Sequence, residues 1–438
     1  MPYGIDGGGR VTDPDLVVHD AAEVVVGPAD GWPVRTVEDG PPESDAVLEI
    51  EPDAAVAVVD GEVAAVGPTE EVTREYPPEN ADHAIGASGN AVIPGFVDPH
   101  THAVFAGDRS DEFGAKVRGK SYQEIAAEGG GILRTVRATR EASDEELLST
   151  LLSHLDTMLA YGTTTAEVKS GYGLDTETEL RLLDVIDRAN GEHPVDLHAT
   201  FMGAHATPEG IEPDAYVEHV VSEQLPAVAD QGVARFCDVF CEAGVFSVNE
   251  SRRVLETGLD YGLSPKIHAE EFERTGGAQL AAALGAASAD HLLQANGTDI
   301  AALVEGGVVP VMLPGTAFVL GEEYADARAF LEAGAPVALA TDFNPNCFSR
   351  SVPFAVSLAC VGMRMTPAEA LVAATANAAR ALDLDDGIGT LREGAPADLL
   401  VLDAPTYRHL PYRLGENPVA RVVKDGRPVA GEVVEIPS

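Results

Sequence analysis

The middle of the chain alternates between short apolar runs and longer stretches with helical periodicity. Residues 144–162 and 178–190 carry apolar side chains three and four positions apart, which predicts amphipathic helices. Between such stretches lie apolar runs of strand length, at residues 92–100, 163–170, 195–205, 235–242, 265–271, 286–292, 308–314 and 336–342. Eight strands that alternate with helices over ~250 residues are typical of a (β/α)8 barrel. We therefore predict an α/β fold, with such a TIM barrel over residues 92–385.

The two ends of the chain have a different pattern. They carry short alternating runs rich in Val and Ala, which Gly, Pro and Asp-Gly pairs interrupt. Asp60-Gly61 and Asp425-Gly426 predict hairpin turns, because Asp-Gly favours the tight turns that join antiparallel strands. We expect residues 1–91 and 386–438 to form one small β-sandwich domain together. A doubly wound open sheet is the alternative for the middle, but no GxGxxG motif follows its first strand.

The charge balance limits what the protein can bind. The 28 Lys and Arg residues face 72 Asp and Glu residues, which gives a net charge of −44. Binding to nucleic acid or to anionic lipid needs a basic surface, so we expect neither partner. Only five of the basic residues are lysines. An acid excess with few lysines indicates a protein adapted to concentrated salt, where the Debye length is about 3 Å at 1 M. An acidic protein from a low-salt cytosol is the alternative.

Neither the apolar runs nor the cysteines point to export. The first residues lack a positively charged segment followed by an apolar one, and no run of 18 or more apolar residues occurs. We expect no signal peptide and no membrane span. The four cysteines are too few for a disulfide framework in 438 residues, so we expect a protein of the reducing cytoplasm.

Residues with ligand chemistry gather where the predicted strands end. They are His100 and His102 after the first strand, His205 after the third, His268 after the fifth, His291 after the sixth and Asp342 after the eighth. Active sites of such barrels lie at this end, and strand residues two positions apart share a face. His100, His102, His268 and Asp342 therefore predict a cage of three nitrogens and one oxygen. This donor set suits one zinc ion or another divalent first-row ion such as iron.

Three further features are predicted to be structural. Lys169 ends the second strand, and we expect it to pair with an acid rather than to bridge two metals, because ligands for only one metal are visible. Cys237 and Cys241 are expected to be buried packing residues, since no second pair completes a zinc site. His154 lies in a helical stretch and is predicted to be on the surface.

Four motifs, FVDPHTH, EVKSGYGL, HAEE and TDFNP, resemble in this order the amidohydrolase superfamily. Together with EGGGILRTVRATR, FMGAHATP and DVFCEAGVFS, they make residues 90–405 similar to the imidazolonepropionase family, ring-opening enzymes of histidine degradation. The resemblance implies hydrolysis of 4-imidazolone-5-propanoate to N-formimino-L-glutamate, with one Zn or Fe ion per chain. It also implies a small anionic substrate, and we expect a homodimer.

The resemblance implies a role for each candidate residue. His100, His102, His268 and Asp342 match the metal ligands. Glu271 matches the general base for the attacking water, and His291 matches a group that assists at the developing oxyanion. Asp342, besides its place among the metal ligands, is also expected to be catalytic. The positions that match substrate contacts are Arg109, Tyr172, His205, Asn344, Asn346 and Cys347. Asn346 and Cys347 depart from the family pattern, which has Gly followed by Ser or Thr there.

Charge and strand geometry bear on two of these residues. Residues 109–140 hold seven basic and four acidic side chains, a net +3 in a very acidic chain. Arg109 lies close to His102 in the sequence and offers a planar fork for a carboxylate. Three other basic side chains of this segment are expected to pair within their own helix; they are Arg134, Arg137 and Arg140. Glu270, the neighbour of Glu271, is expected to face away from the site.

Two other functions stay open. Another mononuclear-metal ring amidohydrolase or a deaminase of the cytosine or guanine type would share the metal cage and differ around Arg109 and Tyr172. A metal-binding protein without catalysis is a second alternative, but it would not need Glu271 or His291.

Overall fold

The computed structural model describes residues 13–29 and 47–431. Within these ranges the strands form two eight-stranded sheets. The segment before residue 13, from which we predicted the lack of a signal peptide, lies outside the described residues. So does the apolar run after residue 431 that we assigned to the terminal β-domain. Among the described residues, no helix is both long enough and apolar enough to cross a bilayer.

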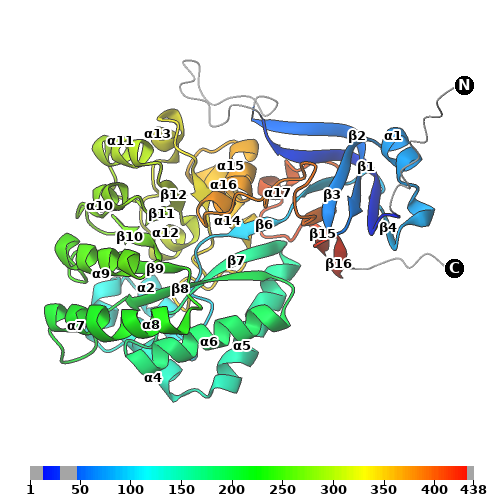
Figure 1. Ribbon diagram of the computed structural model, residues 1–438. Helices are drawn as coiled ribbons and strands as arrows, with labels where there is room; N and C mark the ends of the chain where they lie inside the picture. The colour runs from blue at the N-terminus through cyan, green and yellow to red at the C-terminus, as the bar shows by residue number, and fades with distance from the viewer. Residues whose placement is uncertain (1–12, 30–46, 432–438) are drawn as a thin grey trace, which may run out of the picture.

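The middle of the chain forms the predicted barrel (Figure 1). Its parallel strands pair in chain order: β6 (Phe96–Asp98), β7 (Thr163–Lys169), β8 (Asp196–Ala204), β9 (Phe236–Cys241), β10 (Ser264–Ala269), β11 (Ser288–His291), β12 (Val309–Met312) and β13 (Ala338–Leu339). The chain closes the barrel just beyond β6 and β13, where the amide of Asp342 donates to the carbonyl of His100 at 3.2 Å and that of His102 to Phe343 at 2.9 Å. The prediction of a (β/α)8 barrel is confirmed.

Helices surround the barrel strands (Figure 1). They are α2 (Ser110–Val117), α3 (Tyr122–Ala127), α4 (Gly131–Glu141), α5 (Asp144–Ala160), α6 (Thr176–Glu192), α7 (Pro213–His219), α8 (Leu225–Gln231), α9 (Val248–Asp260), α10 (Gly277–Leu284), α11 (Gly297–Gly306), α12 (Pro314–Leu320), α13 (Ala327–Glu332), α14 (Val352–Gly362), α15 (Pro367–Ala373) and α16 (Ala376–Arg380). The long helix α5 begins with a capping box between Ser143 and Glu146, which satisfies amides at the helix start.

The prediction that His154 lies on the surface is wrong. This residue of α5 is 6% exposed, and its Nδ1 lies 3.0 Å from the carbonyl oxygen of Ala103. The reason is helical spacing: Leu151 and Met158, three positions before and four after it, are both buried. His154 therefore belongs to the apolar stripe of α5 and not to its polar face.

Strands from both ends of the chain form the second sheet. It contains β1 (Leu16–Pro28), β2 (Leu48–Val59), β3 (Glu62–Pro68), β4 (His83–Gly86), β5 (Ala91–Pro94), β14 (Leu399–Leu402), β15 (Val419–Lys424) and β16 (Arg427–Ala430), in the order β16-β15-β14-β5-β1-β2-β3 with β4 paired to β1. The short helices α1 (Thr69–Glu75) and α17 (His409–Tyr412) accompany it. Asp60-Gly61 joins β2 to β3 and Asp425-Gly426 joins β15 to β16, with positive φ at all four residues, so both predicted turns are confirmed.

The terminal sheet contacts the barrel through one face. Along β14, Leu399 and Val401 are buried in the core of the sheet itself, whereas Leu400 and Leu402 belong to the large core that also contains Phe96 of the barrel. This alternation follows from the period of two along a strand. The two parts of the molecule therefore share a buried apolar contact.

Gly95 separates the two sheets. The run 92–100, predicted as one barrel strand, is divided here: β5 pairs with β1 and β14, and β6 pairs with β7. The backbone of Gly95 packs so closely against Thr164 that a Cβ atom would lie 2.7 Å from its Cγ2. A residue without a side chain thus allows the chain to pass from one sheet to the other at this contact.

Candidate active site

Most of the predicted site residues meet in one cavity at the carboxyl end of the barrel. The cavity has a volume of about 50 Å³. It is lined by His102, Arg109, Ile132, Tyr172, His205, Phe240, His268, Glu271, Phe272, His291, Thr316, Leu320, Asp342, Asn344 and Asn346. His100 lies directly beneath, fully buried. Cys347 is also buried but does not line the cavity.

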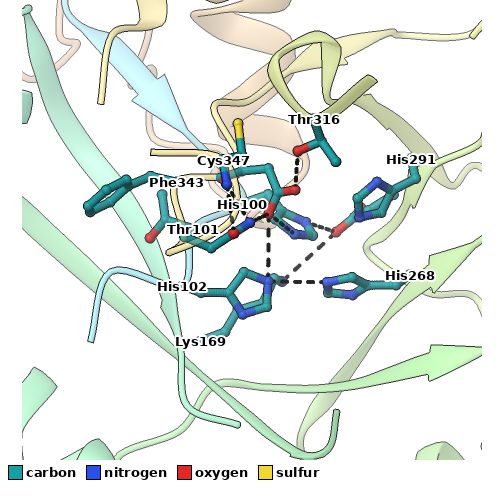
Figure 2. Close-up of polar contacts among 12 residues, drawn as sticks. His100, Thr101, His102, Lys169, His268, His291, Thr316, Phe343 and Cys347 are labelled. Carbon is teal, nitrogen blue, oxygen red and sulfur yellow. Dashed lines mark hydrogen bonds and ion pairs between the residues drawn. The ribbon is translucent and has the colours of Figure 1, made fainter. Parts of the chain in front are cut away.

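The four predicted ligands face one another. The Nε2 atoms of His102 and His268 are 3.3 Å apart, and Figure 2 shows the two rings directed toward each other. Asp342 Oδ1 lies 3.5 Å from His100 Nε2 and 3.7 Å from His102 Nε2. Ligand atoms at ~2.0–2.1 Å around a tetrahedral ion are separated by about 3.4 Å, so these spacings suit a zinc-sized cation.

The protonation of the histidines supports the same conclusion. Burial lowers the pKa of His100 and of His102 well below the ordinary value, so both rings are neutral. The buried Nε2 of His100 has no hydrogen-bond partner among the described residues. Neutral imidazole nitrogens with free lone pairs are the form in which histidine binds metals.

Two carboxylates that the sequence analysis missed orient the ligand rings. His100 Nδ1 lies 2.6 Å from Asp290 Oδ2, and His268 Nδ1 lies 3.1 Å from Asp238 Oδ1. Such contacts fix the tautomer and leave the other ring nitrogen free for a metal. Both acids occupy inner positions of short strands in which all residues are buried. A charged residue at an inward position of a barrel strand was therefore the signal that could have identified them.

Lys169 lies behind these carboxylates. Its fully buried ammonium group is 2.7 Å from Glu167 Oε2 and 2.7 Å from Asp238 Oδ2. The neighbouring acids raise the pKa of Lys169, against the effect of burial, so the side chain is charged. The prediction that Lys169 pairs with an acid is confirmed.

The predicted base and its neighbour point in opposite directions. Glu271 lines the cavity, with one oxygen 3.7 Å from His291 Nε2. The carboxylate of Glu270 instead accepts hydrogen bonds from the amides of Thr275 and Gly276 at 2.7 and 2.9 Å, so it faces away, as predicted. Burial, followed by the charge of Asp342, raises the pKa of Glu271 well above that of an ordinary glutamate. A raised pKa is typical of a carboxylate that exchanges protons during catalysis.

Arg109 offers a hydrogen-bond donor to the cavity. It is 5% exposed, and its Nε donates to Glu112 Oε2 at 2.8 Å. Its Nη2 is buried and has no hydrogen-bond partner among the described residues. A buried guanidinium group with an unused donor is suited to an anion.

The other arginines of this segment bind outside their helix, so the prediction that they pair within it is wrong. Arg134 contacts Asp111 at 2.7 Å, and Arg140 Nε donates to the carbonyl of Gly173 at 2.7 Å. Arg137 likewise donates to a loop carbonyl. These contacts connect α4 to α2 and to two neighbouring loops.

Tyr172 and His205 line the cavity on the side of β7 and β8. The His205 ring stacks on His102 with 4.8 Å between centroids and an interplanar angle of 20°. Its Nδ1 lies 3.0 Å from the carbonyl oxygen of Gly171, beside Tyr172. Burial lowers the pKa of His205 to about 3, so this ring also is neutral.

In the loop after β13, the polar groups of Asn344, Asn346 and Cys347 form hydrogen bonds to other protein groups. The side-chain nitrogen of Asn344 donates to Asp342 Oδ1 at 2.8 Å, and its side-chain oxygen accepts from the backbone amides of Asn346 and Cys347. Asn346 Oδ1 accepts from Lys116 Nζ at 2.8 Å. The thiol of Cys347 lies 3.7 Å from the carbonyl of Thr341, and burial raises its pKa to about 12.

The fold and this site define a class: a metal-dependent amidohydrolase built on a (β/α)8 barrel. The amidohydrolase family model matches residues 260–429, and a model described as the imidazolonepropionase-like composite domain of bacteria matches residues 54–78. Among solved structures, an adenosine deaminase from Xanthomonas campestris with bound zinc is 19% identical and has a TM-score of 0.71, covering 97% of this chain and 95% of its own. At this identity the likeness concerns the fold alone.

Curated relatives narrow the class. The imidazolonepropionase of Haloarcula marismortui is 66% identical over 96% of this chain and 97% of its own length. The imidazolonepropionase of Halobacterium salinarum is 62% identical, and that of Symbiobacterium thermophilum is 48% identical. Each of these two matches covers 95% of this chain and 98% of the relative. The chain belongs to the imidazolonepropionase family. The first two relatives come from halophilic archaea, in line with the acidic composition.

Proposed function

We propose that this protein hydrolyses 4-imidazolone-5-propanoate to N-formimino-L-glutamate. One observation supports this proposal most strongly. A single cavity brings together the possible metal ligands, the buried carboxylate of Glu271 with its raised pKa, and the buried Arg109. Family membership gives the substrate, and the cavity provides a group for each part of it. A cytoplasmic homodimer stays a prediction.

We propose that His100, His102, His268 and Asp342 hold one divalent cation, Zn or Fe. The orphaned His100 Nε2 and the contact between His102 and His268 at 3.3 Å fit such an ion. When bound, the cation would lower the pKa of a water molecule and polarise the substrate carbonyl. Thr316 donates a hydrogen bond to the second oxygen of Asp342, which leaves Oδ1 directed at the histidines.

Glu271 would act as general base. Its carboxylate accepts a proton from the attacking water while the water oxygen forms a bond to the ring carbonyl carbon. The same group then delivers the proton to the ring nitrogen as the C–N bond breaks, so one water is consumed and the ring opens. Positioned proton transfer of this kind typically contributes 10²–10⁴-fold to the rate.

His291 would stabilise the negative charge that develops on the carbonyl oxygen. Burial lowers its pKa well below the ordinary value, so the ring is neutral and carries one N–H donor. Its Nδ1 has no hydrogen-bond partner among the described residues, and its Nε2 lies near Glu271. A preorganised donor in a buried site of low dielectric constant is more effective than the same donor in solution.

Arg109 would bind the propionate group through its unused Nη2, and Tyr172 and His205 would contact the ring. In the loop after β13, we propose that Asn344 and Asn346 contact the substrate, since both line the cavity. Asn344 would hold this loop against Asp342, and Cys347 would support it from below.

The test is a substrate comparison with the purified protein in near-molar KCl. Separate incubations contain 4-imidazolone-5-propanoate, cytosine and guanine, with products followed by mass spectrometry and by ammonia release. We expect N-formimino-L-glutamate from the first and no ammonia from the others. Ammonia release from cytosine or guanine without ring opening of the imidazolone would favour the deaminase alternative, and no turnover of any compound would favour a metal-binding protein without catalysis.

A further inference from the structure

Glu242 is a buried acid with an unusual set of partners. It is the first residue after β9 and is 2% exposed. No ion pair with a lysine, arginine or histidine accompanies it among the described residues. Its Oε2 accepts from the amides of Glu271 and Phe272 at 3.0 and 2.9 Å, and its Oε1 accepts from that of Glu273 at 3.1 Å. The amide of Ala243, next to Glu242 in the chain, also donates to Oε1 at 2.7 Å. The negative charge is thus stabilised by backbone N–H groups, three of which belong to the loop that carries Glu271.

These hydrogen bonds hold the loop where it enters the cavity. Glu270 has a positive φ of 55°, a conformation that few side chains adopt without support. Glu270 attaches the far side of the loop to the start of α10, and Glu242 attaches the side next to the cavity. The backbone of Glu271 is therefore fixed from both directions. This determines the direction in which its side chain leaves the backbone.

We propose that Glu242 is a positioning residue for Glu271: by collecting the amides of residues 271–273, it fixes the carboxylate of Glu271 for proton transfer. The inference rests on the proposed function, in which Glu271 is the base. Charge supports it as well, because Glu242 is one of the acids that raise the pKa of Glu271. A misplacement of a reacting group by 1 Å can cost about 10²-fold in rate, so a loose loop would have a large effect.

A double-mutant cycle tests the proposal. Glu242→Gln keeps the shape but replaces one acceptor oxygen by an NH2 group, which cannot accept from an amide. We expect kcat to fall by about 10- to 100-fold while KM and bound metal stay near wild type. In the Glu271→Gln background the same substitution should change kcat by less than about twofold, because the group it positions is already gone.

Glu369→Gln is the matched control. Glu369 is also a buried carboxylate; it caps α15 by accepting from the amide of Thr366 at 2.8 Å and pairs with Arg328, and neither residue lines the cavity. We expect it to lower the melting temperature without changing kcat at a temperature where the protein stays folded. If Glu242→Gln does not fold, Glu242→Asp, which withdraws the carboxylate by one methylene, is taken through the same cycle.

The possible failures can be told apart. Wild-type kcat in Glu271→Gln would overturn the assignment of the base, and this inference with it. Suppose instead that Glu271→Gln has a low kcat, and that adding Glu242→Gln to it lowers kcat by the same factor as Glu242→Gln does in the wild-type protein. This result would overturn the positioning role alone. So would an unchanged kcat in the single variant Glu242→Gln, or a loss of kcat in Glu369→Gln as large as that in Glu242→Gln.

Discussion

His102 and His268 direct their Nε2 atoms at each other across 3.3 Å, from opposite sides of the barrel. His268 Nδ1 contacts Asp238, which favours a proton on that nitrogen and a lone pair on Nε2. Burial lowers the pKa of His102, so the ring of His102 is neutral. A cation between the two rings gives both nitrogens a partner. The proposed chemistry depends on this relationship.

The acidic limb of the pH-rate profile should report on Glu271. A base must be deprotonated, and burial together with Asp342, Glu242 and Glu322 raises its pKa. The value of kcat/KM should therefore fall as the pH drops through this raised pKa, at a higher pH than an ordinary glutamate would give. Glu271→Gln should lower kcat by about 10²-fold or more, remove this limb and retain the metal. A variant with the wild-type profile would exclude Glu271 as the base.

Arg109→Ala should act on substrate binding. If the guanidinium holds the propionate equally before and during the reaction, KM rises and kcat changes little. Arg137→Ala is the control, because Arg137 belongs to the same basic segment but, within the described part of the chain, donates to the carbonyl of Gly129 alone and does not line the cavity. Steady-state kinetics on 4-imidazolone-5-propanoate should separate the two variants, and an equal KM in both would remove Arg109 from the anion site.

Gly95→Ala should destabilise the junction of the two sheets. The added methyl group would meet Thr164 at 2.7 Å from Cγ2, and overpacking of this kind typically costs about 1–3 kcal/mol. Gly191→Ala in α6 is the control, since a Cβ there has no atom within 4 Å and alanine favours a helix by about 0.5–1 kcal/mol. Denaturant unfolding should show a lower free energy of unfolding for Gly95→Ala and a higher one for Gly191→Ala. A neutral Gly95→Ala would contradict the close contact.

Salt should raise both stability and activity. The net charge of −44 repels itself most strongly in dilute buffer, where the Debye length is about 30 Å at 0.01 M. Screening also helps an anionic substrate to approach an acidic protein. The melting temperature and kcat/KM should therefore rise from dilute buffer to molar KCl. Values that stay flat over that range would show that the acidic composition is no adaptation to salt.

The barrel and the cavity could be predicted from the sequence, because both follow from the order of the strands along the chain and from the residues at the strand ends. Strand ends of a parallel barrel meet at one edge, so a histidine that ends its strand is placed without knowledge of the tertiary structure. Asp238 and Asp290 were missed because they lie inside buried strands and act only through the rings they contact. The role proposed for Glu242 depends on a loop that follows a different strand, and its position in the sequence gives no sign of that contact.

The central claim is that one divalent cation in the cage of His100, His102, His268 and Asp342 is needed for ring opening. Its most direct test is a chelator titration in which bound metal per chain and the rate of imidazolone hydrolysis are measured on the same samples. We expect about one ion per chain at the start, a parallel loss of metal and rate, and recovery of both when Zn or Fe is restored. Asp342→Ala should start the titration with little metal and little activity. Full hydrolysis by protein from which the metal has been removed would contradict the account.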